Sequence, residues 1–218
     1  MSRFFVLFLC LSCSALFAQV RFPHGSGVVD ITKAPYNAKN DGKTDITEIL
    51  QQALDDHPNG NYIIYLPHGN YLISKQISWP QSEKEEESYR RTIIQGESMG
   101  GTIITMQSEA YGFDNPDAPR AMFYTGMGDY SHERNAIRDV TLHTGKRNPG
   151  IIGIRFNASY QGNITNVKII SDDGKGVAGI DMNYTDNIGP LYIKNVEIRG
   201  FDVGILTGRR QSLGFPHS

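Results

Sequence analysis

Four aspartates in the last third of the sequence could supply the carboxyl groups that cleavage of a glycosidic bond requires. One carboxylic acid must protonate the leaving oxygen, and a carboxylate must attack or activate water. The catalytic candidates are Asp172, Asp173, Asp181 and Asp186. Asp181 alternates with apolar neighbours, so on a strand it would point away from the core, where ordinary solvation is the simpler interpretation. The run Asp172-Asp173-Gly174 is typical of a turn, which we favour over a catalytic pair.

Basic side chains could serve a different reaction, the β-elimination of a uronic acid polymer. In that chemistry calcium or a basic group neutralises the uronate, and Lys or Arg removes the C5 proton. The candidates at strand positions expected to face outward are Arg155, Lys168, Lys194 and Arg199. Arg155 and Lys168 are the preferred substrate-binding candidates, although surface charge is the simpler explanation of each.

Aromatic side chains between residues 107 and 135 could stack on the apolar faces of sugar rings. Tyr124 and Tyr130 are the preferred candidates, followed by Tyr111 and Phe113. Packing of a loop onto the molecule would explain them equally well. The histidines show no metal-ligand spacing, so we predict no metal site and no cofactor, with calcium as an option only for the elimination reaction.

Composition narrows the classes of partner. The 218 residues carry 21 Lys and Arg against 23 Asp and Glu, which gives no electrostatic argument for nucleic acid. A local basic cleft that binds a polyanion is compatible with this balance. The 23 glycines suit a fold with many tight turns rather than a helical bundle.

The N-terminus predicts export. Arg3 supplies a positive n-region, Phe4 to Leu11 is an apolar h-region too short to span a bilayer, and cleavage after Ala18 fits the pattern. An uncleaved anchor is the alternative. Cleavage there removes both cysteines, Cys10 and Cys13, and leaves a mature chain without thiols or disulfides. We therefore expect a secreted, periplasmic or extracellular protein with no membrane association after cleavage.

An internal repeat in the last third is the strongest structural signal. Three segments with alternating apolar residues align on a valine, and these valines are 27 and 29 residues apart. A second series, which begins with Gly-Ile, follows each segment and recurs at intervals of 26 and 25 residues. The aligned positions are Val140, Val167 and Val196, and Gly153, Gly179 and Gly204. Two short strands per repeat at this period predict a parallel solenoid whose valines and isoleucines stack inward. A β-sandwich would not explain the near-constant spacing.

The N-terminal half is predicted to supply a cap and the first coils. Residues 45–56 predict an amphipathic helix with Asp45 as its N-cap and Glu48 completing a capping box. Such a helix would cover the open end of a solenoid. Strands are predicted at 62–66, 71–73, 92–96 and 102–104, and residues 107–135 are predicted to form a long irregular loop.

Two N-terminal motifs resemble the opening of the pectate lyase/rhamnogalacturonase superfamily. Residues 36–54, Y-N-A-K-N-D-G-K-T-D-I-T-E-I-L-Q-Q-A-L, resemble the signature G-A-x-x-D-G-x-x-D-D-T-x-A-I-Q-x-A. Residues 65–73, Y-L-P-H-G-N-Y-L-I, resemble its continuation, v-y-[IL]-P-x-G-x-Y-x-[IV]. Asn37 and Ile46 depart from the usual Gly and Asp. The chain is most similar to proteins described as glycosyl hydrolase family 28-related.

This resemblance implies an all-β, right-handed parallel β-helix with an N-terminal capping helix. After the signal peptide (1–18), one domain is expected over 19–218, with a cap at about 28–60 and coils at about 61–207. Members of the family usually carry more coils, so we expect the domain to be incomplete at its C-terminus. The family's Gly-His-Gly and Arg-x-Lys motifs are absent, and Asp172-Asp173 and Asp186 match its acidic motifs only weakly.

The resemblance also implies a function. A secreted, carbohydrate-active protein is expected, which hydrolyses glycosidic bonds in an extracellular, pectin-like polysaccharide. The alternatives are a polysaccharide lyase that acts by β-elimination and a non-catalytic β-helix that binds glycans or serves as an adhesin.

Overall fold

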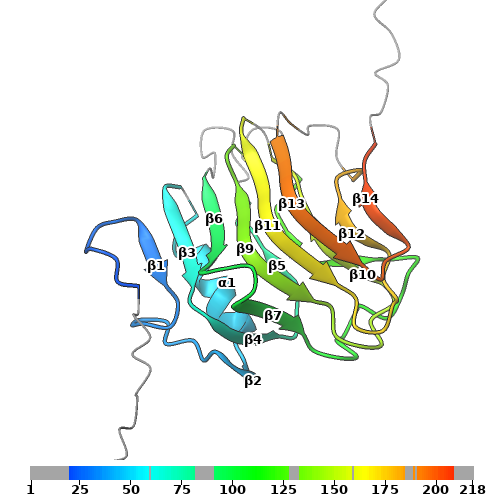
Figure 1. Cartoon of the computed structure of the whole chain (residues 1–218), viewed down its shortest axis with the longest axis horizontal. Coiled ribbons are helices and arrows are strands. Elements are labelled where there is room, and N and C mark those ends of the chain that lie inside the picture. Colours follow the sequence, from blue (N-terminus) through cyan, green and yellow to red (C-terminus); the bar gives the residue numbers. More distant parts are fainter. Residues whose placement is uncertain are drawn as a thin grey trace, which may run out of the picture.

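The chain folds as a parallel β-solenoid of about five turns (Figure 1). The computed structural model describes residues 20–58, 60–81, 91–127, 133–158, 160–184, 189 and 191–208. Sheet A contains β1 (Val28–Asp30), β2 (Asp41–Asp45), β3 (Tyr62–Leu66), β4 (Gly69–Ile73), β6 (Thr92–Gly96), β7 (Thr102–Met106), β9 (Ala136–His143), β11 (Gly162–Ile170) and β13 (Leu191–Arg199). Sheet B contains β5 (Ile77–Ser78), β8 (Arg120–Tyr124), β10 (Ile151–Arg155), β12 (Ala178–Asp181) and β14 (Val203–Leu206). The predicted fold class is confirmed.

The three aligned valines lie in register on neighbouring strands. Val167 of β11 pairs with Val140 of β9 on one side and with Val196 of β13 on the other, in parallel ladders. Val140 and Val167 are fully buried, and Val196 packs against the same core. The repeat spacing therefore corresponds to one coil of the solenoid, as predicted.

A row of left-handed residues bends sheet A within each of its long strands. Asp139, Asn166 and Asn195 have φ values of 56°, 55° and 52°. Asn and Asp tolerate this conformation better than other residues with a side chain. The Asn195 Nδ2 donates to Asn166 Oδ1 and the Asn166 Nδ2 donates to Asp139 Oδ1, each at 2.8 Å. The first half of β9 accordingly pairs with β6 and the second half with β7.

The Gly-Ile series marks the place where the two sheets approach closely. A Cβ built on Gly153 would lie 2.6 Å from Ile169 Cγ2, a side chain of sheet A. A side chain at this position would therefore force the sheets apart, whereas the next residue, Ile154, fits into the core with no exposure.

One helix, α1 (Thr47–Asp55), lies in the described residues and packs against β5. Its N-cap residue is Ile46, one residue later than predicted, because Asp45 acts from the preceding position. The Asp45 carboxylate accepts hydrogen bonds from the backbone and hydroxyl of Thr47, at 2.9 and 2.5 Å. Gln51 donates to the Ser78 carbonyl and accepts from its N–H, at 2.8 and 2.9 Å. The helix thus covers the free edge of sheet B, as expected of a cap.

The predicted irregular loop at 107–135 is wrong in one respect, because β8 (Arg120–Tyr124) lies inside it and joins sheet B. Its middle residues, Ala121, Met122 and Phe123, are all buried, so the strand shows no alternation by which the sequence could reveal it. Phe113 is also buried in the core, whereas Tyr111 is fully solvated. The predicted signal peptide lies outside the described residues, within which no helix is long and apolar enough to cross a bilayer.

Candidate functional site

Three of the predicted site residues come together on the outer face of sheet B. Tyr124 ends β8, Arg155 ends β10 and Asp181 ends β12, and the register pairs Arg155 with both of the others. Each follows an inward-facing core residue, which is Phe123, Ile154 or Ile180. Because parallel coils stack in register, residues about 26 to 31 positions apart become neighbours along the solenoid axis. We refer to Tyr124, Arg155 and Asp181 as the sheet B ladder.

Arg155 and Asp181 form an ion pair that is largely shielded from water. The Arg155 Nε donates to Asp181 Oδ2 at 3.0 Å, and the Asn183 N–H donates to Asp181 Oδ1 at 2.9 Å. The Asp181 side chain is 6% exposed and the Arg155 side chain 25%. The expectation of a solvated aspartate was therefore wrong. The side chain faces away from the core, as predicted, but its neighbours bury it.

Tyr184 covers this ion pair, and the sequence did not single it out. The Arg155 guanidinium lies 5.8 Å from the centre of the Tyr184 ring, and the Tyr124 and Tyr184 rings are also 5.8 Å apart. The Tyr184 hydroxyl donates to the Gly126 carbonyl at 2.9 Å. Burial raises the pKa of Tyr184 well above its usual range, and that of Tyr124 more modestly. Tyr184 follows the strand, where periodicity gives no signal, so only the fold places it on the ladder.

Asp172 and Asp173 do not join the ladder, and the turn interpretation of this pair fits their contacts. Both follow β11, at the end of sheet A. Asp172 accepts hydrogen bonds from His143 Nδ1 at 2.5 Å and from the Gly145 N–H at 2.8 Å. Asp173 accepts from the N–H groups of Arg147 and Lys175, at 2.6 and 3.2 Å. These bonds fasten one turn to the turn of the preceding coil.

The remaining predicted site residues are either on another face or outside the described part. Lys168 belongs to β11 of sheet A, where its Nζ pairs with Glu197 at 3.0 Å, so it does not share a face with Arg155. Asp186 and Tyr130 lie outside the described residues. Within the described ranges, no group of three or more His, Cys, Asp or Glu side chains could hold a metal ion.

The sheet B ladder, together with Tyr184, can therefore offer a shielded carboxylate, a guanidinium and two tyrosines on one face. Ion-paired and aromatic groups of this kind can contact sugar hydroxyls, carboxylates and ring faces. Asp172 and Asp173 are bonded within the turns that follow sheet A, and Asp181 pairs with Arg155. The predicted arrangement of two neighbouring carboxylates is therefore not formed by Asp181 with Asp172 or Asp173.

Comparisons with solved structures agree with the fold. The Geobacillus virus E2 protein ORF18 superposes with a TM-score of 0.55 at 18% identity, over 77% of this chain and 31% of that protein. The catalytic unit of an α-1,3-glucanase of family GH87 from Streptomyces thermodiastaticus gives a TM-score of 0.49 at 14% identity, over 87% and 34%. The chain thus spans about a third of the length of these proteins, and at 18% identity the likeness to ORF18 concerns the fold alone.

Sequence comparison adds the family. A LysM effector, "Non-secreted LysM effector LysM19", from Penicillium expansum is 38% identical over 60 residues, which are 28% of this chain and 5% of that protein. The profile of the family described as "Rhamnogalacturonase A/epimerase, pectate lyase-like" matches residues 33–214, a range that contains every described strand from β2 onward and the whole sheet B ladder. The chain is therefore a member of the pectate lyase-like rhamnogalacturonase A/epimerase family, a family of carbohydrate-active β-helices.

Proposed function

We propose that this protein acts on an extracellular polysaccharide that binds along the outer face of sheet B, and that it hydrolyses a glycosidic bond there. The observation that carries the proposal is the ladder itself, in which neighbouring coils bring Tyr124, Arg155 and Asp181 onto one face. Asp181, held by Arg155 at 3.0 Å, is the carboxylate we assign to the reaction. The N-terminal segment, which has the pattern of a signal peptide, supports secretion.

The tyrosines are assigned to binding rather than to proton transfer. Burial raises the pKa of Tyr124 and of Tyr184, so both hydroxyls stay protonated at neutral pH. The Tyr184 ring lies 5.8 Å from the Arg155 guanidinium and 5.8 Å from the Tyr124 ring, an arrangement that suits a sugar ring with a hydroxyl or carboxylate at its edge.

Elimination is the second candidate, and one observation favours it. Asp181 is paired with an arginine, and β-elimination from a uronate needs a basic side chain and a positive charge rather than two carboxyl groups. Calcium would take part only in this reaction, so a loss of activity on addition of a chelator would identify elimination.

The test is an assay of the full chain on polygalacturonate and on a neutral β-glucan, with reducing ends and ultraviolet absorbance followed together. Hydrolysis releases reducing ends without an ultraviolet-absorbing product. An unsaturated, absorbing product would replace hydrolysis by elimination, and the absence of any product from either polymer would sink the enzymatic proposal.

Variants locate the activity. Asp181→Asn should lower the rate by about 100-fold or more, because it removes the charge of the assigned carboxylate. The control variant is Asp202→Asn. Asp202 is exposed and lies immediately before β14 of sheet B, so its substitution should leave the rate unchanged. An Asp181→Asn protein that folds and keeps the full rate would remove the ladder from the mechanism.

A further inference from the structure

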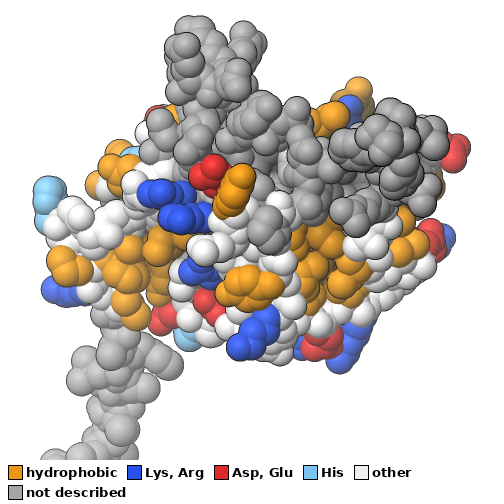
Figure 2. All heavy atoms as spheres, turned by 90° about the horizontal axis from the view of Figure 1, so that it is seen from above, with side chains coloured by type: hydrophobic (Ala, Val, Ile, Leu, Met, Phe, Trp, Pro, Cys, Tyr) orange, Lys and Arg blue, Asp and Glu red, His pale blue; other side chains and the backbone are white. Residues whose placement is uncertain are grey.

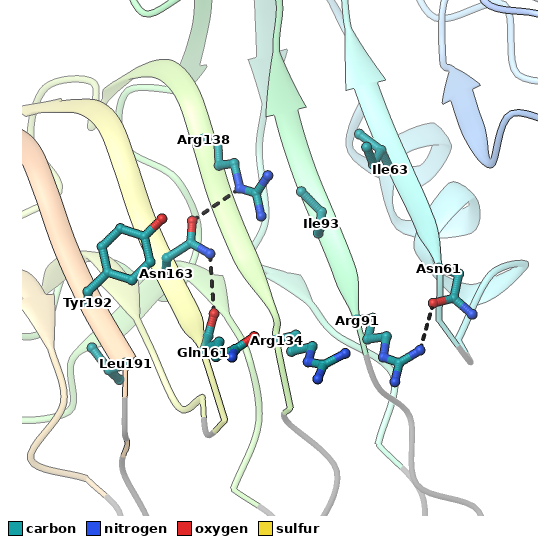
Figure 3. A pocket seen from close by; sticks show the side chains of 10 residues that line it. All are labelled: Asn61, Ile63, Arg91, Ile93, Arg134, Arg138, Gln161, Asn163, Leu191 and Tyr192. Carbon is teal, nitrogen blue, oxygen red and sulfur yellow. Dashed lines mark hydrogen bonds between the residues drawn. The ribbon is translucent and has the colours of Figure 1, made fainter.

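A groove with a volume of about 700 Å³ crosses the outer face of sheet A at the start of its strands (Figure 3). Its lining comes from consecutive coils, those of β3, β6, β9, β11 and β13. Because neighbouring strands lie about 4.8 Å apart, five strands extend over roughly 19 Å along the solenoid axis. None of its lining residues belongs to the sheet B ladder.

One edge of the groove is a column of residues that occupy the same position in successive coils. The column consists of Asn61, Arg91, Arg134 and Gln161. Each lies two residues before a position at which β3, β6, β9 and β11 pair in register. All four have a left-handed backbone, with φ values of 64°, 62°, 61° and 80°. This conformation is unusual for arginine, and residues held in it are often found at functional sites.

The groove carries positive charge that its described neighbours do not neutralise. The Arg91 Nη1 donates to Asn61 Oδ1 at 3.0 Å, while the buried Arg91 Nε has no hydrogen-bond partner. On the other side, the Arg138 Nε donates to Asn163 Oδ1 at 3.1 Å. The amide partners are uncharged, no ion pair joins Arg134 to a carboxylate within the described residues, and the described residues that line the groove include no Asp or Glu.

The floor of the groove is apolar and ends in an aromatic ring. Ile63 and Ile93 pair in register on β3 and β6 and face outward, and Leu191 lies at the other end. Tyr192 is 51% exposed and pairs with Asn163. Figure 2 shows the molecule of Figure 1 from above, and on this face hydrophobic side chains lie next to side chains of Lys or Arg. Apolar and aromatic surfaces suit the faces of sugar rings, and amide groups suit their hydroxyls.

We propose that this groove is a second polysaccharide site, which binds a linear anionic polysaccharide independently of the sheet B ladder. An extended polysaccharide advances by close to one coil spacing per sugar, so successive sugars would meet successive coils. The acidic groups would pair with Arg91, Arg134 and Arg138, and Tyr192 would stack on a terminal ring. The carboxylate of a uronate and the sulfate ester of a sulfated glycan share this chemistry.

Calorimetric titration of the full chain with polygalacturonate and with ι-carrageenan tests the proposal, with neutral dextran as the reference polymer. Binding to at least one anionic polymer and none to dextran is expected, and the tighter of the two identifies the acidic group. The double variant Arg134→Asn/Arg138→Gln should lose affinity by about tenfold or more, because it removes two cationic side chains that would form charge-assisted hydrogen bonds with the acidic groups. Asn favours the left-handed backbone, so Arg134→Asn removes the charge without straining the turn.

A matched control separates this site from general electrostatics. Lys43→Gln removes a positive charge from the exposed strand β2 and should leave the affinity unchanged. Equal binding of dextran, an unchanged affinity in the arginine double variant, or an equal loss in Lys43→Gln would overturn the proposal. So would sedimentation showing that the arginine variant dissociates a dimer, since the groove would then join two copies of the chain.

Discussion

The environment of each candidate aspartate that the structure describes is set by side chains and N–H groups of the neighbouring coil. Asp181 is shielded because Arg155 of the neighbouring strand holds it at 3.0 Å and Tyr184 lies over the pair. Asp173 has a structural role, since its carboxylate accepts hydrogen bonds from N–H groups of two turns. Both aspartates were candidates for catalysis in the sequence, and their partners assign Asp181 to the ladder and Asp173 to the turn that the sequence favoured for it.

Asp173 should make stability depend on pH. Partial burial raises the pKa of Asp173, but the hydrogen bonds from the N–H groups of Arg147 and Lys175 lower it by more. The pKa therefore lies below its usual value. A lowered folded-state pKa stabilises the protein above the unfolded value of about 3.9, and this contribution is lost as the pH falls through the folded value. Because Asp173 is exposed and water screens its interactions, Asp173→Ala should destabilise by only about 0.5–1 kcal/mol at pH 7 and by less near pH 3.

Urea unfolding at the two pH values measures this difference, with Asp202→Ala as the control for an exposed aspartate. A loss in Asp173→Ala that is equally large at pH 3 would show that the carboxylate's charge is not what the turn uses.

Elements are joined by side-chain rows at the corners of the coils. Asn166 lies between Asp139 and Asn195, makes a hydrogen bond to each at 2.8 Å, and has a left-handed backbone. The row lets each long strand change direction at the same height as its neighbours, which keeps both halves of sheet A in register.

Asn166→Ala should lower the free energy of unfolding by about 2–4 kcal/mol, because it removes two hydrogen bonds and replaces asparagine by a residue that tolerates the left-handed backbone less well. Asn166→Gly should recover about 1 kcal/mol of that loss, since glycine has no such strain. Chemical denaturation of the three proteins provides the comparison. Equal stabilities for the Ala and Gly variants would contradict a role for the backbone conformation.

At the scale of the whole molecule, a solenoid must protect the strand at its end. The edge of β5 would expose the backbone of Ser78, and Gln51 of α1 occupies both of its hydrogen-bonding groups. The same helix buries Leu50 and Leu54 over the core. The cap therefore stabilises the molecule and also hides an edge that another chain could pair with.

Gln51→Ala should cost about 1–3 kcal/mol of stability and increase self-association, because it leaves two backbone groups of the edge strand unpaired. Gln52→Ala, one position further along the exposed side of α1, is the matched control. Unfolding curves and sedimentation velocity record the two effects. Indistinguishable behaviour of the two variants would mean that the helix protects the edge without Gln51.

Much of the fold could be read from the sequence, because one coil repeats the same inward positions. The spacing of Val140, Val167 and Val196 predicted their stacking, and the Gly-Ile series predicted the strands of sheet B. Strand β8 escaped prediction because its middle residues are buried on both faces and show no period of two. Alternation with a period of two reveals only strands with one face toward water, whereas the buried strands β10 and β12 were revealed by the recurrence of the Gly-Ile series.

The sequence by itself determined the solenoid, its capping helix and the family, since these depend on local periodicity and on contiguous motifs. Tertiary structure alone decided which side chains meet. It joined Arg155 to Asp181 and Tyr184, directed Asp172 and Asp173 into a turn, and aligned Arg91 with Arg134 along one groove. The physical reason is that such neighbours are one coil apart, so small differences in turn length decide which residues stack, and no local pattern records them.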